Sequence, residues 1–327
     1  MPDRLVVLYR GNLPPATGLI ERLADTVYAT EEELPLLLPG ADALMAWVTI
    51  TPAIRESWPD NPEKAPRWVH ASSAGVDSFL FPALVDDPGV TLTNARGVYD
   101  QPTAEYVLGL ILALAKDFPG TWEHQQRREW RPRPSDSIVG RTALIWGTGP
   151  IGRAIARLLR AVGMRVCGAG RTARTHDPDF GTLHGPAGLR SGLAEADYVV
   201  LAAPLTEATR GMVDASALAA MKPGARLINV GRGGLVDEEA LIHHLADGRL
   251  AGAALDVFDE EPLPARSPLW DMPGVMISPH TAGETTSERE ALIEVFLDNL
   301  TRHTEGRPLR NVVDKRRGYV VDGTRSG

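Results

Sequence analysis

The sequence is short of cysteine: Cys167 is the single one among 327 residues, so no disulfide can form within the chain. That composition is typical of a protein from a reducing compartment. Basic residues are not in excess either, because 34 Lys and Arg are outnumbered by 42 Asp and Glu, giving a formal net charge of −8. Binding to nucleic acid needs a basic surface that contacts phosphates, so we expect no nucleic-acid partner.

Long hydrophobic segments are also absent. The longest apolar stretch with helical character, Tyr106 to Ala115, is well below the roughly 20 residues that span a bilayer. The N-terminal run Leu5–Tyr9 is too short for the hydrophobic region of a signal peptide. We therefore expect a cytoplasmic protein that does not enter a membrane.

Short apolar runs alternate with turn-forming residues, which indicates an α/β protein, and the length of 327 residues suggests two domains. The first hundred positions predict a small α/β domain with buried parallel strands. The strand–helix alternation from Arg141 onward predicts a doubly wound parallel sheet. The expected strands are Leu5–Tyr9, Ala43–Val48, Trp68–Ala71, Val90–Thr93, Thr142–Trp146, Arg165–Gly168, Tyr198–Ala202, Arg226–Val230, Ala251–Val257 and Val275–Ser278.

Two helices and a connector are expected outside these strands. Asp100 or Thr103 should cap a helix that is apolar on nearly every face up to Ala115, and such a helix must be buried on all sides. It packs either within an ordinary core or against another domain or a second subunit. The polar segment from Trp122 to Ser137 is interpreted as a solvated connector, with a nucleic-acid contact as the alternative. A second helix is expected from Ser287 to His303.

A glycine-rich loop follows the predicted strand Thr142–Trp146. The residues Gly147-Thr148-Gly149-Pro150-Ile151-Gly152 match the pattern G-x-G-x-x-G. The first glycine allows a tight turn, the second lets the backbone approach a pyrophosphate, and the third lets helix and strand pack closely. The pyrophosphate would lie at the N-terminus of the following helix, where N–H groups and the helix dipole favour an anion. A loop between a strand and a helix therefore predicts a dinucleotide site rather than a chance turn.

The second predicted strand of this sheet lacks an acidic residue at its end. In NAD-binding versions such an acid binds the ribose hydroxyls roughly 20 residues past the loop. Here Gly170 stands at that place, 170 − 152 = 18 residues after Gly152, and Arg171-Thr172-Ala173-Arg174 follows. Because a guanidinium pairs with a phosphate through two hydrogen bonds, this replacement favours NADP(H), with NAD(H) also possible. The alternative is two exposed surface arginines.

Three charged residues come directly after predicted strands of the same sheet: Arg232, Glu261 and His280. Ligands of open α/β sheets gather at the carboxyl ends of the strands, so we expect the three to converge on one site. Arg232 could bind a carboxylate or polarise a carbonyl, and His280 could exchange a proton with an alcohol oxygen. Glu261 beside the imidazole would raise its pKa and fix its orientation. Together with a nicotinamide, this set is suited to hydride transfer to a 2-keto acid.

The sequence resembles the D-2-hydroxyacid dehydrogenases, a family that includes glyoxylate/hydroxypyruvate reductases and phosphoglycerate dehydrogenases. The resemblance covers nearly the whole chain. The stretches that carry it are Gly147–Gly152, Pro204–Thr209, Asn229–Asp237, Ala254–Leu263 and Ser278–Gly283. The resemblance implies that Arg232 binds substrate, that Glu261 raises the pKa of the histidine, and that His280 donates the proton.

The resemblance also implies further contacts with cofactor and substrate. The family's partner of the nicotinamide amide falls on Asp256, and the N–H groups of Ala74 and Gly75, in the loop Ser73–Asp77, would hold the substrate carboxylate. Trp47 ends a predicted strand and either faces the substrate or packs in the core. Further cofactor contacts are expected at Ala203, Pro204, Thr209, Val230, Gly231, His280 and Gly283.

The resemblance further implies two Rossmann-like or flavodoxin-like α/β domains with doubly wound parallel sheets and a cleft between them. Residues 1–101 and 284–327 would form a discontinuous substrate domain. Residues 102–283 would form the dinucleotide-binding domain, around which a homodimer would assemble.

The expected function is the NADPH-preferring reduction of a small 2-keto acid to a D-2-hydroxy acid, with His280 as proton donor. The alternatives are a non-catalytic dinucleotide-sensing module, such as a corepressor, and a formate or phosphite dehydrogenase. The three charged residues together argue against the first, and Glu261 argues against formate, because that branch generally lacks the glutamate. His243 and His244 have no metal-ligand spacing around them, and we expect no metal site.

Overall fold

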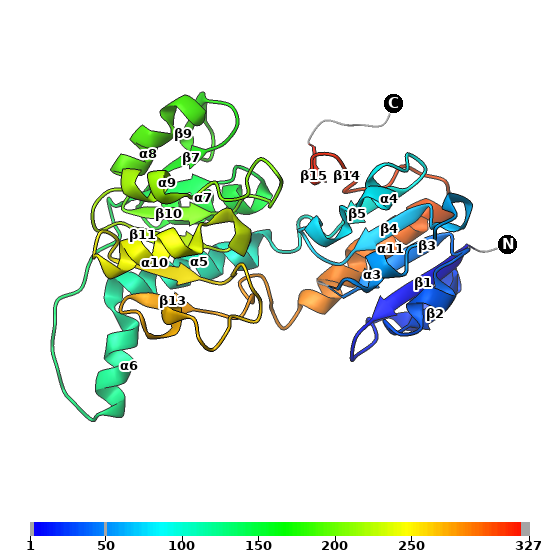
Figure 1. Ribbon diagram of the computed structural model, residues 1–327, viewed down its shortest axis with the longest axis horizontal. Helices are drawn as coiled ribbons and strands as arrows, with labels where there is room; N and C mark the ends of the chain where they lie inside the picture. The colour runs from blue at the N-terminus through cyan, green and yellow to red at the C-terminus, as the bar shows by residue number, and fades with distance from the viewer. Residues whose placement is uncertain (1–2, 49–50, 322–327) are drawn as a thin grey trace. The chain divides into compact units, whose positions relative to one another are not determined.

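The computed structural model describes residues 3–48 and 51–321, and the chain folds into two compact α/β units (Figure 1). Unit 1 comprises Met1–Val98 and Thr285–Gly327, and unit 2 comprises Tyr99–Glu284. The Tyr99 ring lies against Gly283, where a Cβ would be 2.6 Å from Tyr99 Cδ1, so Tyr99 belongs with unit 2. Both large sheets consist mainly of parallel strands, which confirms the predicted α/β class.

Unit 1 is built around a five-stranded parallel sheet in the order β2-β1-β3-β4-β5. Its strands are β1 (Arg4–Tyr9), β2 (Asp25–Ala29), β3 (Ala43–Trp47), β4 (Trp68–Ala71) and β5 (Thr91–Asn94). Its α-helices are α1 (Thr17–Leu23), α2 (Leu34–Leu37), α3 (Ala53–Glu56), α4 (Pro82–Val85) and α11 (Glu288–Thr304), and a small separate hairpin consists of β14 (Val313–Asp314) and β15 (Tyr319–Val320). The edge strand β2 was not predicted, because it contains no continuous apolar run.

Strand β1, which lies between β2 and β3, separates two hydrophobic cores. Its residues Leu5–Leu8 are fully buried, and they alternate between the two cores. One core is completed by α11, whose Phe296 ring stacks on Trp68 with 5.5 Å between centroids. Figure 1 shows this helix, in orange, behind the sheet. Burial of both faces explains the apolar strands, and the contribution of α11 explains why unit 1 is assembled from both ends of the chain.

Strand β4 contains a fully buried histidine, His70. Its Nδ1 shares a 2.9 Å hydrogen bond with the Thr93 hydroxyl, and the rings of Trp68 and Phe296 lie beside it. Burial lowers the pKa of His70 from 6.5 to about 3, so the folded protein holds the neutral imidazole. This histidine is therefore part of the core.

We expect the neutral state of His70 to make folding stability depend on pH. The neutral imidazole contributes fully to the free energy of unfolding above pH 6.5. This contribution is lost as the pH falls from 6.5 towards 3, because in that range only the unfolded chain binds the proton. Between roughly pH 7.5 and 5 the loss is about 2 kcal/mol of unfolding free energy, measurable by urea denaturation. His70→Asn, which keeps an amide atom near Thr93, should lose about 2 kcal/mol less over that interval. Equal losses in the two proteins would contradict this.

Unit 2 contains an eight-stranded sheet in the order β13-β12-β11-β10-β6-β7-β9-β8, in which β8 runs antiparallel to β9. Its strands are β6 (Thr142–Trp146), β7 (Arg165–Ala169), β8 (Arg174–Asp177), β9 (Gly181–His184), β10 (Tyr198–Leu201), β11 (Arg226–Asn229), β12 (Gly252–Leu255) and β13 (Val275–Ile277). Its helices are α5 (Asp100–Lys116), α6 (Phe118–Gln126), α7 (Pro150–Ala161), α8 (Leu189–Glu195), α9 (Ala215–Ala220) and α10 (Glu238–Ala246). All predicted strands of this unit are present with small shifts at their ends, whereas β8 and β9 were not predicted.

Helix α5 lies in the core of unit 2, where Val107 is fully buried together with Ile155 of α7. The predicted N-cap was wrong: the cap is Tyr99, not Asp100 or Thr103. The helix starts early enough to place the Asp100 carboxylate in its first turn, where the helix dipole favours a negative charge, and Thr103 lies inside the helix. In the part of the chain that the structure describes, no helix, α5 included, is long and apolar enough to cross a bilayer.

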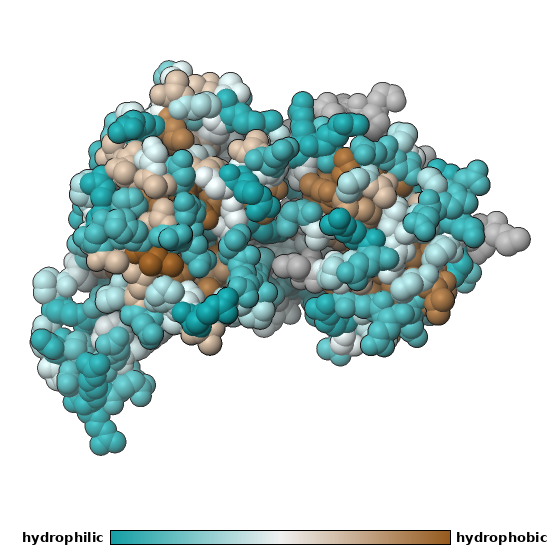
Figure 2. Space-filling model, viewed as in Figure 1, coloured by the Kyte–Doolittle hydropathy of each residue, from teal (hydrophilic) through white to brown (hydrophobic). Residues whose placement is uncertain are grey.

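Helix α6 and the irregular segment after it extend away from the rest of unit 2 (Figure 1). Trp122 and Trp130 are 62% and 96% exposed. Figure 2 shows mostly hydrophilic residues over this part of the molecule. Arg133 ties the segment to the start of α6 through an ion pair with Asp117 at 2.7 Å. The predicted polar connector therefore begins as a helix and continues without regular structure.

Candidate functional site

The glycine loop connects β6 to α7 in unit 2. Gly147 has a φ of +130°, and a side chain there would overlap the backbone of Ala202. A side chain at Gly152 would overlap the carbonyl of Gly147, so these two glycines allow strand and helix to approach closely. At Gly149, the residue before α7, a Cβ would meet no atom within 4 Å. The loop thus leaves open space before the N-terminus of a 12-residue helix, which suits a pyrophosphate.

Gly170 lies beside this loop, directly after β7. A Cβ at Gly170 would be 3.3 Å from the side chain of Thr148. The N–H of Gly170 donates to the carbonyl of His184 in β9 at 3.0 Å. Arg171 is exposed in the loop that follows, and the exposed Arg174 begins β8. The position next to the glycine loop therefore carries no carboxylate, and two arginines follow it.

The side chain of Asn229, at the end of β11, shapes the turn that carries Arg232. Its Oδ1 accepts a backbone N–H of that turn at 3.1 Å, and its Nδ2 donates to the Arg232 carbonyl at 2.9 Å. A side chain at Gly233 would overlap the backbone of Phe258, so this turn contacts the segment that leads to Glu261. Asn229 was not predicted as a site residue, although a buried polar residue at the end of an apolar strand is a signal for one.

His280 and Glu261 are in direct contact. His280 Nδ1 and Glu261 Oε2 are 2.8 Å apart, and Glu261 Oε1 accepts the Phe258 N–H at 3.0 Å. The two side chains are 34% and 28% exposed, so solvent reaches both. Burial raises the pKa of Glu261, but hydrogen bonds from His280 and Phe258 and the charge of Arg232 outweigh it and hold the pKa below its ordinary value. Glu261 is therefore a carboxylate at neutral pH.

The loop that bears His280 is held by Asp256, which is 1% exposed. The Asp256 carboxylate accepts the Ser278 hydroxyl at 2.7 Å and the N–H groups of Thr281 and Ala282 at 2.9 Å. The Asp256 carbonyl also accepts the N–H of His280 at 2.8 Å. His280 has a φ of +56°, an uncommon backbone conformation that these bonds stabilise. The sequence did not reveal this role of Asp256 in holding the loop.

The remaining predicted cofactor contacts lie beyond the carboxyl ends of strands of the same sheet. Thr209 closes the turn after β10, where its hydroxyl donates to the Pro204 carbonyl at 2.7 Å. The others in this region are Ala203, Val230, Gly231 and Gly283. The carboxyl edge of the unit 2 sheet thus brings together the glycine loop, Arg232, Glu261 and His280.

The predicted substrate loop lies in unit 1, directly after β4. The Asn94 amide donates to the Ala74 carbonyl at 2.6 Å, and the Ser73 hydroxyl donates to the Gly75 carbonyl at 2.7 Å. Both Ala74 and Gly75 are partly exposed. The neighbouring strand β5 and the loop itself therefore fix these two residues.

Trp47 lies at the end of β3 and is half-buried. It packs against the core that α11 completes, and the Arg289 guanidinium lies 5.3 Å from the centroid of a Trp47 ring. The side chain therefore contributes to core packing while part of it is exposed.

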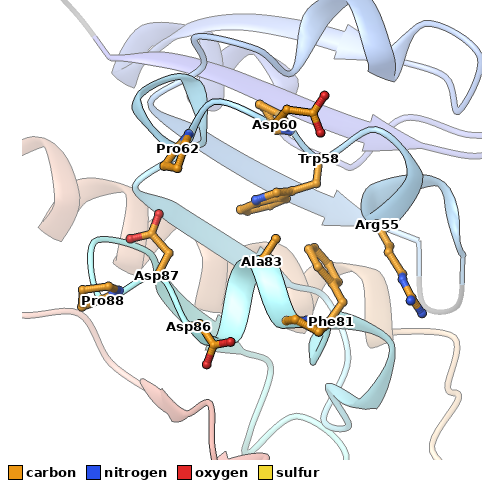
Figure 3. Close-up of a pocket in the computed structure, with 11 residues that line it drawn as sticks. Arg55, Trp58, Asp60, Pro62, Phe81, Ala83, Asp86, Asp87 and Pro88 are labelled. Carbon is orange, nitrogen blue, oxygen red and sulfur yellow. The ribbon is translucent and has the colours of Figure 1, made fainter.

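A pocket of about 730 Å³ opens on unit 1 between residues 55–62 and 81–88 (Figure 3). Trp58 and Phe81 pack edge to face within it, with 5.2 Å between ring centroids. The charged residues of its lining are Arg55, Asp60, Asp86 and Asp87. This excess of negative charge disfavours an anionic substrate or a dinucleotide. The pocket was not predicted, because its two walls are distant in sequence.

Comparisons with known proteins identify the family to which this sequence is similar. Residues 108–282 match the family model described as "D-isomer specific 2-hydroxyacid dehydrogenase, NAD binding domain". The glyoxylate/hydroxypyruvate reductase B of Pectobacterium carotovorum is 36% identical over 264 residues, which cover 77% of this chain and 81% of that protein. The glyoxylate reductase of Pyrococcus furiosus is 35% identical over 238 residues, which cover 69% of this chain and 70% of that protein.

A solved structure is similar over almost the whole chain. It is the NADPH-dependent glyoxylate/hydroxypyruvate reductase of Sinorhizobium meliloti, in complex with NADP and sulfate. The sequence identity is 29%, the TM-score is 0.80, and the match covers 97% of this chain and 100% of that chain.

Proposed function

The chain belongs to the D-isomer specific 2-hydroxyacid dehydrogenase family and is an oxidoreductase that uses a nicotinamide dinucleotide; on this premise we propose that it reduces a small 2-keto acid to a D-2-hydroxy acid, preferably with NADPH. The observation that carries the proposal is the contact of His280 with Glu261 at 2.8 Å. The positive charge of Arg232 helps to keep that glutamate ionised. These residues lie on the sheet that bears the glycine loop. Relatives named as glyoxylate and glyoxylate/hydroxypyruvate reductases support a substrate of this size.

Each site residue has its own task in this reduction. Arg232 binds the substrate carboxylate and polarises the carbonyl. Nε2 of His280 donates a proton to the carbonyl oxygen, and the dinucleotide, when bound, supplies the hydride for the carbonyl carbon. The Glu261 carboxylate contacts Nδ1, so it orients the imidazole and stabilises its protonated form.

The cofactor preference rests on the region after β7. Arg171 and Arg174, with Thr172 between them, bind the 2′-phosphate that distinguishes NADPH from NADH. A small, uncharged residue at Gly170 leaves no carboxylate that would repel that phosphate. Asp256 accepts a hydrogen bond from the nicotinamide amide in addition to holding the His280 loop.

Unit 1 acts as the substrate domain in this proposal, and unit 2 acts as the dinucleotide-binding domain. The N–H groups of Ala74 and Gly75 bind the substrate carboxylate, and the exposed part of Trp47 contacts the substrate. The protein forms a homodimer around unit 2. Trp122 of α6 and Trp130 of the irregular segment after it are exposed and contribute apolar surface to the dimer interface. Its molecular mass in solution tests this assembly.

Initial rates with glyoxylate, hydroxypyruvate, pyruvate and phenylpyruvate, each with NADPH and with NADH, test the proposed activity. We expect turnover of at least one acid, with kcat/KM for NADPH about tenfold or more above that for NADH, which corresponds to one phosphate contact. Absence of turnover with all four would favour a dinucleotide-sensing module. A preference for NADH would refute the cofactor assignment.

A further inference from the structure

The β8–β9 hairpin carries Arg174, and its shape depends on the carboxylate of Asp177. The Asp177 side chain is fully buried. Its Oδ1 accepts the N–H groups of Asp179 and Phe180 at 3.1 and 3.3 Å, which closes the turn between the two strands. One buried carboxylate thus organises the hairpin.

Arg153 of α7 ties this turn to the glycine loop. Its Nη1 and Nη2 donate to the two oxygens of Asp177 at 3.0 and 3.2 Å, and Nη1 also donates to Asp179 at 2.8 Å. The Arg153 hydrogen bonds hold the pKa of Asp177 below its ordinary value against the effect of burial. Bidentate pairs of this kind fix orientation as well as distance. Because Arg153 directly follows Gly152, the pair links the hairpin to the end of the glycine loop.

Arg174 contacts the same carboxylate. Its Nη1 lies 3.4 Å from Asp177 Oδ2, and its side chain is 61% exposed. At the other end of the hairpin, the Gly170 N–H bonds to β9, and Gly170 lies against Thr148 of the glycine loop. The hairpin and its exposed arginine are therefore attached to the glycine loop at two points.

We propose that the Asp177–Arg153 pair is a positioning element for the 2′-phosphate of the dinucleotide, because it fixes Arg174 relative to the glycine loop. This inference rests on the proposed preference for NADPH. NADPH carries the phosphate that Arg174 would contact and NADH lacks it. Loss of the pair therefore weakens binding of NADPH and leaves binding of NADH unchanged.

Asp177→Asn tests the role of the pair. The amide oxygen can still accept the N–H groups of the turn, whereas the charge and one acceptor for Arg153 are lost. We expect the Kd for NADPH, measured by quenching of protein fluorescence, to rise about fivefold to tenfold, and the Kd for NADH to stay within about twofold. The matched control is Asp298→Asn, because Asp298 also pairs with an arginine, Arg302 at 2.9 Å, but lies on α11 of unit 1, which does not contain the hairpin. We expect it to keep the NADPH-to-NADH ratio of the unmodified protein.

Arg153→Lys is a second variant, which keeps the positive charge and loses the bidentate geometry. We expect Arg153→Lys to show the same loss of NADPH affinity. If Asp177→Asn does not fold, the Kd values of Arg153→Lys for NADPH and NADH test the positioning role instead. An unchanged NADPH-to-NADH ratio in Asp177→Asn, together with a lost preference in Arg174→Ala, overturns the positioning role while the cofactor proposal stands. Tighter NADPH binding by Asp177→Asn also overturns it, because the carboxylate would then only compete for Arg174. If the unmodified protein binds NADH more tightly, the cofactor proposal itself fails, and this inference fails with it.

Discussion

His280→Asn is expected to lower kcat by roughly 10²- to 10⁴-fold, the range for loss of a general acid. His280 has a φ of +56°, and asparagine is among the residues that tolerate this conformation. The asparagine amide can still donate to Glu261, so the loop and the neighbouring carboxylate keep their contact. What the variant loses is the proton donor at Nε2. The measurement is the rate of NADPH oxidation at saturating 2-keto acid, combined with the Kd for NADPH, which should stay within about twofold.

The chain offers a matched control for this substitution. His176 is an exposed histidine with a φ of +59°, so His176→Asn makes the same replacement in the same backbone conformation. We expect His176→Asn to keep kcat within about twofold. A His280→Asn protein that kept kcat within about tenfold of the unmodified protein would contradict the proposed role of His280.

The glycine loop and the strands around it were predictable because their signals are local. The pattern G-x-G-x-x-G is contained in six consecutive residues, Gly147 to Gly152. Strands β6 and β10 are short apolar runs. The hairpin of β8 and β9 was not predictable, because its two polar strands lie at the edge of the sheet. Its turn is held by Arg153, which is 24 residues before Asp177. No pattern within the hairpin itself identifies that partner.

The convergence of Arg232, Glu261 and His280 could be predicted from the sequence, because ligands of open α/β sheets gather at the carboxyl ends of parallel strands. The contact of Glu261 with His280 joins residues that are 19 positions apart. The backbone conformation of His280 depends on a buried carboxylate, Asp256, that precedes it by more than twenty residues. Asn229 likewise acts by bonding the turn that carries Arg232. These hydrogen bonds from Asp256 and Asn229 form only where separate loops meet in the folded chain. The spacing of residues along the sequence does not specify which loops meet.

Glu261→Gln is expected to reduce kcat/KM for 2-keto acid reduction by roughly 10- to 100-fold near pH 8 and by much less near pH 5.5. The pKa of the Glu261 carboxyl is held below its ordinary value, so in the unmodified protein a negative charge faces His280 throughout this range. That charge stabilises the protonated imidazole that donates the proton. A glutamine amide that points its N–H at Nδ1 favours the neutral imidazole instead. The alkaline limb of the profile of kcat/KM against pH should therefore lie at lower pH in the variant than in the unmodified protein.

The neighbouring residue provides the control for this pH profile. Glu260→Gln makes the same substitution one position earlier, at an exposed side chain that pairs with Arg266 at 3.3 Å. Because this ion pair is on the surface and does not involve His280, its loss should leave the profile of kcat/KM against pH unchanged. Glu261→Gln would lower the whole profile without moving it if the glutamate only held the Phe258 N–H in place. A shift of the alkaline limb in Glu261→Gln alone therefore separates charge stabilisation of the imidazole from a structural role of the loop.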